Sequence, residues 1–269
     1  FTAEINPNVN VVFLCLGHGK SISFLKENQF ASHTKIIDLG NDFRLNKDAH
    51  FEGKDFIYGL PEINKTEIKK ANYIANPGCF ATAIQLALLP LAEHNLLNND
   101  VHINATTGST GAGVSLSETS HFSWRNNNLS VYKAFEHQHL NEIGESLTQL
   151  QADFDKDINF IPYRGDFTRG IMASCYLDCD LSLQEVENLY QDFYADAPFT
   201  HISKANIDLK QVVNTNKCLI HLEKHGNKLM ILSIIDNLLK GASGQAVQNM
   251  NIIFGLEENT GLKLKTVAY

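Results

Sequence analysis

Residues 73–89 read YIANPGCFATAIQLALL, which predicts a short strand, a sharp corner and a helix in direct succession. Pro77 lacks a backbone N–H, and Gly78 reaches dihedral angles that are closed to other residues, so both suit the corner. A strand that leads straight into a helix is the building unit of α/β folds. This stretch therefore predicts an α/β architecture with a sharp strand-to-helix corner at Cys79.

Cys79 stands at the first turn of the predicted helix. The unpaired N–H groups and the positive end of the helix dipole lie there, and they favour a thiolate over a thiol. The thiolate is the reactive form of cysteine. Most single cysteines are buried structural residues, but a corner presents the sulfur, so we interpret Cys79 as a nucleophile.

Two further strands are predicted before this stretch. Residues 10–16 (NVVFLCL) and 35–39 (KIIDL) are continuous apolar runs, as in parallel strands that are buried on both faces, and a short helix is expected at 23–28. This order indicates a doubly wound α/β unit. Gly17, His18 and Gly19 follow the first strand, at the end where ligands gather in such sheets, although a full G-x-G-x-x-G pattern is missing.

The sequence after the Cys79 helix has a different pattern. Strands are predicted at 101–106, 169–178, 218–223 and 229–235, with a tight turn at 225–227. A capping box at 182–185 opens a helix, and a final amphipathic helix covers 243–254. We therefore expect an α+β domain with a mixed or antiparallel sheet. The expected division is 1–78, 79–240 and a C-terminal helical part, 241–269, that returns to the first domain.

Composition narrows the function. The chain has 269 residues with 43% hydrophobic content and a net charge of −8, which argues against nucleic-acid binding. No apolar run approaches the ~20 residues of a membrane span. Five scattered cysteines without a C-x-x-C pair fit a reducing compartment, so we expect a cytoplasmic protein. The chain starts at Phe1, close to a buried strand, and we expect an N-terminal segment to precede it.

His137, His139 and Glu142 form the best candidate partner cluster for Cys79. A positioned histidine contributes on the order of 10² to 10⁴ in rate as an acid or base. His139 and Glu142 are three residues apart and share a helix face. The same residues would suit zinc or iron, and they could also be plain surface residues. The residue types alone leave these three readings open.

Other candidates are weaker in isolation. The glycine-rich loop at 108–113 could cradle a phosphate or admit a flat ring, yet an ordinary turn reads the same way. Arg44 follows a predicted buried strand and could bind a carboxylate or phosphate through two hydrogen bonds. Arg164 and Arg169 share that ambiguity, because an ion pair on the surface is the usual role of an arginine.

Together these segments resemble the N-acetyl-γ-glutamyl-phosphate reductases, enzymes of arginine biosynthesis. The matching motifs occur in the order GHG (17–19), DLGNDFRL (38–45), YGLPE (58–62), NPGC (76–79), GSTGAG (108–113), HQH with Glu142-Ile143 (137–143), RGI (169–171) and DNLLKGA (236–242). The resemblance implies a Rossmann-like NAD(P)-binding domain, here without its N-terminal part, and a catalytic domain similar to that of glyceraldehyde-3-phosphate dehydrogenase. It also implies a homo-oligomer, a dimer or a tetramer.

The resemblance further implies a covalent mechanism. The Cys79 thiolate attacks the acyl phosphate and expels phosphate, and hydride from NADPH reduces the thioester to a semialdehyde, so one difficult step becomes two. His137 would be the acid/base. The substrate-binding residues would be Arg44, Tyr132, His139 and Glu142. The cofactor-binding residues would be Gly17, His18, Gly19, Ser109, Gly111 and Asn237, and no metal ion is implied.

Departures from the pattern and rival functions remain. The dinucleotide fingerprint would lie before Phe1, which leaves NADP or NAD preference open, and Val114 stands where the family usually has arginine. An aspartate-semialdehyde dehydrogenase is a rival with the same chemistry. A metal-dependent hydrolase built on His137, His139 and Glu142 and a non-catalytic binding module are rivals of other classes. The acyl group on the substrate nitrogen, acetyl or succinyl, is also open.

Overall fold

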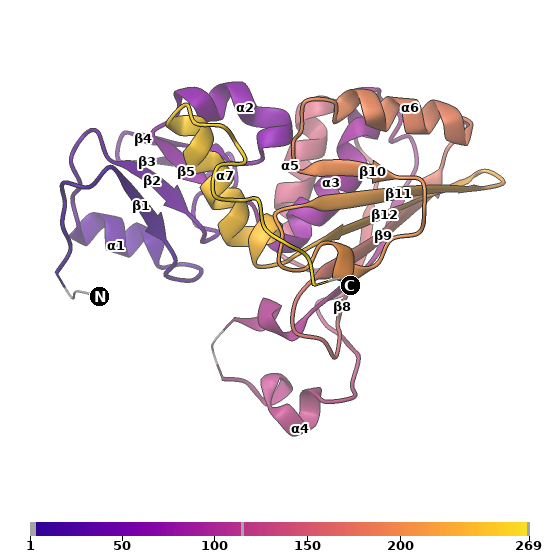
Figure 1. Cartoon of the computed structure of the whole chain (residues 1–269), viewed down its shortest axis with the longest axis horizontal. Helices are drawn as coiled ribbons and strands as arrows, with labels where there is room; N and C mark the ends of the chain where they lie inside the picture. The colour runs from indigo at the N-terminus through magenta and orange to yellow at the C-terminus, as the bar shows by residue number, and fades with distance from the viewer. Residues whose placement is uncertain (1–3, 114–115, 268–269) are drawn as a thin grey trace. The chain divides into compact units, whose positions relative to one another are not determined.

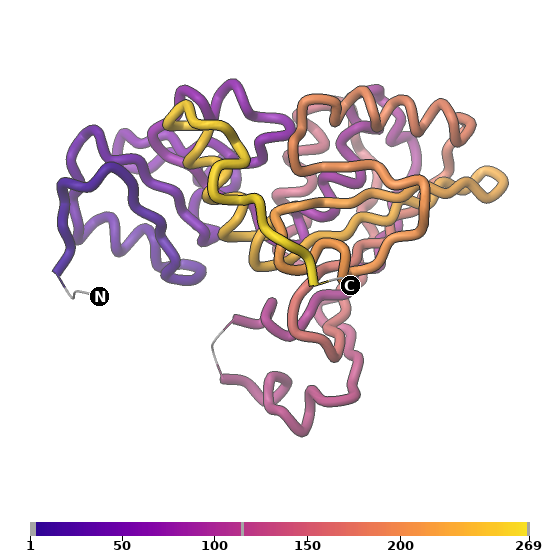
Figure 2. Tube along the Cα trace, viewed as in Figure 1, coloured from indigo at the N-terminus to yellow at the C-terminus, as the bar shows by residue number. Residues whose placement is uncertain are grey.

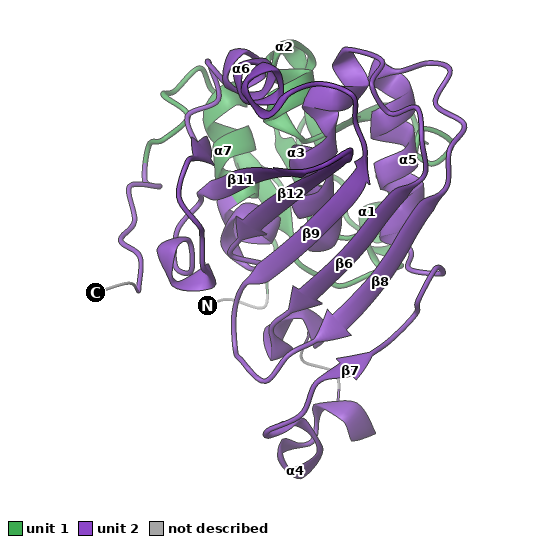
Figure 3. Ribbon diagram, turned by 90° about the vertical axis from the view of Figure 1, so that its right-hand side faces the viewer, with its two compact units in different colours: residues 1–78, 245–260 green, residues 79–244, 261–269 purple. Residues whose placement is uncertain are grey.

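The structure is a computed structural model that describes residues 4–113 and 116–267 (Figure 1). The chain forms two compact units, which Figure 3 distinguishes by colour. Unit 1 contains residues 1–78 and 245–260, and unit 2 contains residues 79–244 and 261–269. The first boundary between the two units therefore falls between Gly78 and Cys79, within the predicted strand-to-helix corner.

Unit 1 is built on a five-stranded sheet in the order β1-β2-β5-β4-β3. Its first four strands in that order are parallel, and only β3 runs antiparallel to β4. The strands are β1 (Val11–Leu14), β2 (Lys35–Asp38), β3 (His50–Phe51), β4 (Lys54–Tyr58) and β5 (Tyr73–Ala75). The helices are α1 (Ser21–Glu27), α2 (Pro61–Lys70) and α7 (Gly244–Ile253), whose first residue belongs to unit 2.

Alternate residues of each parallel strand enter different hydrophobic clusters. Ile36 and its neighbours pack with Leu25 of α1, whereas Ile37 packs with Ile68 of α2 and Ile252 of α7. Helices on both faces of a parallel sheet make this a doubly wound unit, which confirms the prediction from the two apolar runs. Figure 2 shows how the yellow segment that carries α7 comes back to the indigo and violet strands of unit 1.

Unit 2 contains a seven-stranded mixed sheet in the order β10-β11-β12-β9-β6-β8-β7. The pairs β10–β11 and β6–β8 are parallel, and the other four pairs are antiparallel. The strands are β6 (Val101–Thr107), β7 (Ser130–Val131), β8 (Ile158–Arg164), β9 (Ile171–Asp178), β10 (Thr200–Ser203), β11 (Cys218–His225) and β12 (Lys228–Ile235). The predicted mixed sheet and the two-residue turn at Gly226-Asn227 are confirmed.

Helices α3 (Cys79–Glu93), α5 (His139–Leu150) and α6 (Leu183–Phe193) cover one face of this sheet (Figure 3). Burial in β6 alternates accordingly, with Val101, Ile103 and Ala105 buried and the residues between them partly exposed. The remaining elements are α4 (Phe122–Arg125), the short 3₁₀ turns η1 (Ser109–Ala112), η2 (Glu118–Ser120) and η3 (Leu209–Gln211), and the π-helical turn η4 (Leu239–Ser243).

Candidate active site

Cys79 is the first residue of α3, as the sequence predicts. The helix is apolar all round, and residues 80–92 are buried, as expected for a helix at the centre of a domain. Cys79 alone keeps partial exposure at its N-terminal end, whereas Cys175 and Cys218 are buried inside strands. The corner therefore leaves this sulfur partly accessible at the N-terminal end of α3, where the helix dipole is positive.

Helix α5 is fixed against α3 by one buried amide. Gln85 of α3 is fully buried, and its Nε2 donates to the carbonyl oxygen of Glu142 at 2.9 Å and to Oγ of Ser146 at 2.8 Å. Glu142 also lies 3.7 Å from His139, measured from Oε1 to Nε2, and both side chains are buried. The predicted helical pair of His139 and Glu142 is thus present on α5.

His137 lies just before α5 in an aromatic surround. The ring of Phe80, the residue after Cys79, meets the imidazole edge-on with centroids 5.4 Å apart. Phe160 of β8 lies 5.5 Å away and His139 4.6 Å away, measured in the same way. Burial, together with the positive charges of Lys133 and Arg164, lowers the pKa of His137 to about 4. The imidazole is therefore neutral at physiological pH.

The tautomer of His137 follows from its backbone neighbour. The N–H of His139 donates to Nδ1 of His137 at 3.3 Å, so Nδ1 acts as the acceptor. In a neutral imidazole only one ring nitrogen carries a proton. Nε2 therefore carries it, which makes Nε2–H a hydrogen-bond donor in the resting protein.

Tyr132 completes this cluster. Its ring lies 5.8 Å from that of His137, and the Arg164 guanidinium stacks 4.6 Å from the Tyr132 centroid. Burial first, and then the negative charge of a Cys79 thiolate, raises the pKa of Tyr132 to about 12, which its contact with Arg164 only partly offsets. The sequence motifs thus bring Cys79, Tyr132, His137, His139 and Glu142 together in unit 2.

Arg44 belongs to unit 1 and is buried. Its Nε donates to the carbonyl oxygen of Asn76 at 2.9 Å, and its Nη2 donates to that of Leu39 at 3.1 Å. These two carbonyl groups follow the adjacent strands β5 and β2. Arg44 therefore holds the two strand ends together, a structural role that the sequence did not indicate, and its role as a substrate clamp stays a prediction.

The loop after β1 carries Gly17, His18 and Gly19 in unit 1. Gly17 and Gly19 have φ angles of +85° and +76°, and no atom lies within 4 Å of the place where a Cβ would stand at either one. The N–H of Gly19 donates to Oδ2 of Asp42 at 2.9 Å, which anchors the loop. An open, left-handed glycine turn at the carboxyl end of a parallel strand suits a cofactor.

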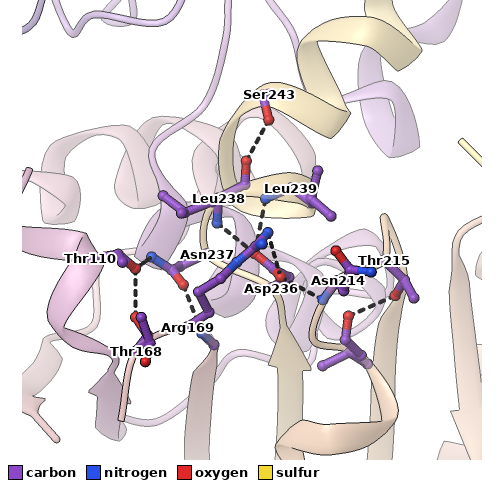
Figure 4. A network of polar contacts seen from close by, with 12 residues as sticks. Thr110, Thr168, Arg169, Asn214, Thr215, Asp236, Asn237, Leu238, Leu239 and Ser243 are labelled. Carbon is purple, nitrogen blue, oxygen red and sulfur yellow. Dashed lines mark hydrogen bonds and ion pairs between the residues drawn. The ribbon is translucent and has the colours of Figure 1, made fainter. Parts of the chain in front are cut away.

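Asn237 connects the glycine-rich loop with the turn that follows β12 (Figure 4). Its Oδ1 accepts from the N–H of Gly170 at 2.7 Å, and its Nδ2 donates to Oγ1 of Thr110 at 3.0 Å. Ser109 and Gly111 lie in the same loop, where Ser109 N–H donates to the Phe167 carbonyl at 2.8 Å. Val114 lies outside the described residues.

A metal site and a membrane-spanning helix are both absent from the part of the chain that the structure describes. Within residues 4–113 and 116–267, no group of three or more His, Cys, Asp or Glu side chains is placed to bind a metal ion, so His137, His139 and Glu142 do not form such a site. None of the helices described is both long enough and apolar enough to span a membrane.

Sequence reasoning missed several residues that shape the site. Phe80 and Phe160 pack on His137, the charge of Lys133 helps to lower the pKa of His137, and Gln85 joins α3 to α5. Arg164, which the sequence left ambiguous, contributes to the same lowered pKa. A glutamine inside an otherwise apolar helix was the one available signal, because a buried amide needs partners. Arg169 proves to be an ion-pair residue, with Nη2 2.8 Å from Oδ2 of the buried Asp236.

Comparison with known proteins places the chain in a family. Residues 1–71 match the model for the semialdehyde dehydrogenase NAD binding domain, and residues 79–237 match that for the semialdehyde dehydrogenase dimerisation domain. The chain resembles aspartate semialdehyde dehydrogenase II of Vibrio cholerae in fold, with a TM-score of 0.70, 14% identity and coverage of 92% of this chain and 80% of the other.

Three relatives named N-acetyl-gamma-glutamyl-phosphate reductase are far more similar in sequence. The protein of Flavobacterium johnsoniae is 79% identical over 98% of this chain and 82% of its own length. That of Christiangramia forsetii is 62% identical over 98% and 81%, and that of Bacteroides fragilis is 58% identical over 100% and 83%. The chain belongs to the N-acetyl-gamma-glutamyl-phosphate reductase family.

Proposed function

We propose that the chain reduces an N-acyl-γ-glutamyl phosphate to the N-acyl-glutamate semialdehyde, with release of phosphate, as a step of arginine biosynthesis. The observation that carries this proposal is that Cys79, Tyr132 and His137 lie together in unit 2. It is supported by the 79% identity to the relative named N-acetyl-gamma-glutamyl-phosphate reductase. Unit 2 would hold the chemistry, and unit 1 would bind most of the cofactor.

Cys79 acts as the nucleophile. Its thiolate attacks the γ-carbonyl carbon, a C–S bond forms, and the C–O bond to phosphate breaks, which leaves a thioester and inorganic phosphate. A bound nicotinamide cofactor supplies the hydride that reduces this thioester. The resulting oxyanion expels the Cys79 thiolate and becomes the aldehyde, so that the sulfur returns to its starting state.

His137 stabilises negative charge on the substrate oxygen. The route as a whole begins and ends with the Cys79 thiolate, so the cycle requires no net proton from the imidazole. The Nε2–H donor that the structure assigns to neutral His137 suits the oxyanion of both tetrahedral intermediates. This role is narrower than general acid/base catalysis. His139, Glu142 and Tyr132 would orient the substrate, and Arg44 would bind its α-carboxylate.

The residues present fit a nicotinamide cofactor. The left-handed turn at Gly17 and Gly19 leaves its inner face open, as close approach of a ligand to the backbone requires. The side-chain amide of Asn237 has two N–H groups, and one of them donates to Thr110. The second N–H is the donor that we propose for the cofactor. Gly17, His18, Gly19, Ser109, Gly111 and Asn237 would hold the cofactor, which we take to be NADPH.

The proposal extends to the compartment, the oligomeric state and the substrate of the enzyme. All five cysteines are free thiols, which supports a reducing compartment, the cytoplasm. The match of residues 79–237 to a dimerisation domain supports a homo-oligomer, either a dimer or a tetramer. The substrate is a small molecule, and its acyl group is acetyl by family analogy.

The proposal is tested by Cys79→Ser in the reverse reaction, the phosphate-dependent oxidation of N-acetylglutamate semialdehyde by NADP. We expect activity to fall by roughly 10³-fold or more, because a hydroxyl at this position is a far weaker nucleophile. Cys218→Ser is the matched control: its Sγ lies 3.5 Å from Oγ of Ser233, so a hydroxyl finds a partner there. Near-normal activity of the Cys79→Ser variant would overturn the mechanism.

A further inference from the structure

A close backbone contact lies directly behind Cys79. A Cβ placed on Gly241, in the turn η4, would stand 2.8 Å from Cβ of Cys79 and 3.1 Å from its Cα. The φ angle of Gly241 is not in the left-handed region, so lack of space, and not backbone strain, excludes a side chain. No flexible side-chain end can yield, because both atoms belong to the base of the nucleophile itself.

The turn that carries Gly241 is organised by Asp236. This residue follows β12 and is fully buried. Its Oδ1 accepts from the N–H of Leu238 at 2.8 Å and from that of Leu239 at 3.1 Å. Its carbonyl oxygen accepts from the N–H of Gly241 at 3.0 Å. One residue thus fixes the path of the chain from the end of the sheet to the contact with Cys79.

The second carboxylate oxygen of Asp236 ties this turn to two other loops of unit 2. Oδ2 lies 2.8 Å from Nη2 of Arg169 and accepts from the N–H of Asn214 at 2.7 Å (Figure 4). Removal of one partner from a buried ion pair is strongly destabilising, so these contacts hold the arrangement firmly. The next residue, Asn237, is fixed within the same turn by Gly170 and Thr110.

We propose that Asp236 and Gly241 are positioning residues for the nucleophile: Asp236 sets the turn, and the glycine at position 241 leaves the room that Cα and Cβ of Cys79 need, so that the sulfur keeps its reactive place. A side chain at position 241 would push against Cβ of Cys79, the atom that carries Sγ, and would so change the direction of the sulfur. The kinetic part of this proposal rests on the proposed function, whereas the position and reactivity of the sulfur do not.

Gly241→Ala tests the contact, and Gly144→Ala on α5 is the matched control, because no atom lies within 4 Å of a Cβ at Gly144. We expect Gly241→Ala to lower kcat roughly 10²-fold with little change in KM, since a displacement of about 1 Å at the reacting group has that effect. The rate of Cys79 alkylation by iodoacetamide, followed against pH, should change as well. Gly144→Ala should match the wild type in both.

Asp236→Asn tests the anchor and covers the case in which Gly241→Ala fails to fold, as judged by circular dichroism. An amide at this position puts an NH₂ group opposite the donors Arg169 or Asn214, and the turn should loosen. A changed Cys79 alkylation profile in a folded variant supports the proposal. A folded variant with lowered kcat and an unchanged alkylation profile overturns it. Because alkylation requires no turnover, this result stands apart from the outcome for Cys79→Ser.

Discussion

The ring of Phe80 stands edge-on against the imidazole of His137, with centroids 5.4 Å apart and planes at 79°. Phe80 is bonded directly to Cys79, so this contact ties the nucleophile to its partner histidine although the two lie far apart in the sequence. An aromatic edge against a neutral ring also excludes water, which contributes to the lowered pKa of His137. The contact with Phe80 therefore both positions His137 and contributes to the burial that keeps its imidazole neutral.

The accessible position of Cys79 predicts selective alkylation. Iodoacetamide should label Cys79 well before Cys175, which is fully buried and whose pKa burial raises to about 12. Peptide mass spectrometry over a time course measures the order, and 6 M urea serves as the control in which all five cysteines should react. Equal rates for both residues in the folded protein would contradict an activated sulfur.

His137 predicts a dependence of stability on pH. Its pKa is about 4 in the folded protein and about 6.5 when unfolded, so the unfolded state binds its proton first as the pH falls. His137 therefore leaves the free energy of unfolding unchanged above pH 6.5 and lowers it progressively as the pH falls from 6.5 to 4. Between pH 7.5 and 4.5 the wild type should lose about 2.5 kcal/mol more than His137→Gln, since each pKa unit is worth about 1.4 kcal/mol.

Urea titration of the free energy of unfolding at the two pH values checks this difference. His33→Gln, at an exposed histidine, is the control and should follow the wild type. Parallel curves for the wild type and His137→Gln would show that His137 titrates normally.

Gln85 predicts a link between stability and catalysis. Gln85→Leu leaves the carbonyl of Glu142 and the hydroxyl of Ser146 without this donor inside the protein. We expect a loss of about 1–3 kcal/mol in the free energy of unfolding, together with a lower kcat because α5 carries His139. Gln184→Leu, on the exposed side of α6, should stay within about 0.5 kcal/mol of the wild type.

Tyr132 predicts a role that requires its hydroxyl. With a pKa of about 12 it stays protonated throughout any practical assay range and can donate a hydrogen bond. Tyr132→Phe keeps the ring against His137 and Arg164, so the fold should be retained, and kcat/KM should fall by about tenfold, the worth of one hydrogen bond. Steady-state kinetics measures this, and an unchanged kcat/KM would leave the hydroxyl without a part in the reaction.

The sequence predicts those parts of the fold whose pattern is local. Examples are the apolar runs that form β1 and β2 and the strand, corner and helix around Cys79. Consecutive residues are enough to predict their burial. Strand β8 was missed, since Pro162 inside it reads against a strand. Strand β4 was missed as well, because its charged residues Lys54 and Asp55 interrupt the apolar pattern.

The motifs predicted the residues of the site, whereas the packing that surrounds these residues was not predicted. The resemblance identified Cys79, His137 and Tyr132, but no local pattern reveals that Phe80 and Phe160 enclose the imidazole. The same holds for Gly241. A side chain at this position would collide with Cys79, which lies more than a hundred residues away in the sequence. Contacts of this kind depend on tertiary packing and become visible only in the folded chain.

The discontinuity of unit 1 has a consequence for biosynthesis. Ile252 of α7 packs in one cluster with Ile37 and Ile74 of the parallel sheet, and yet it is synthesised after the whole of residues 79–244. When the chain has been synthesised only as far as Gly78, α7 is not yet made and the face of the sheet that it covers is exposed. All strands of the unit 2 sheet are synthesised before α7, so the completion of unit 1 has to wait for residues 245–260.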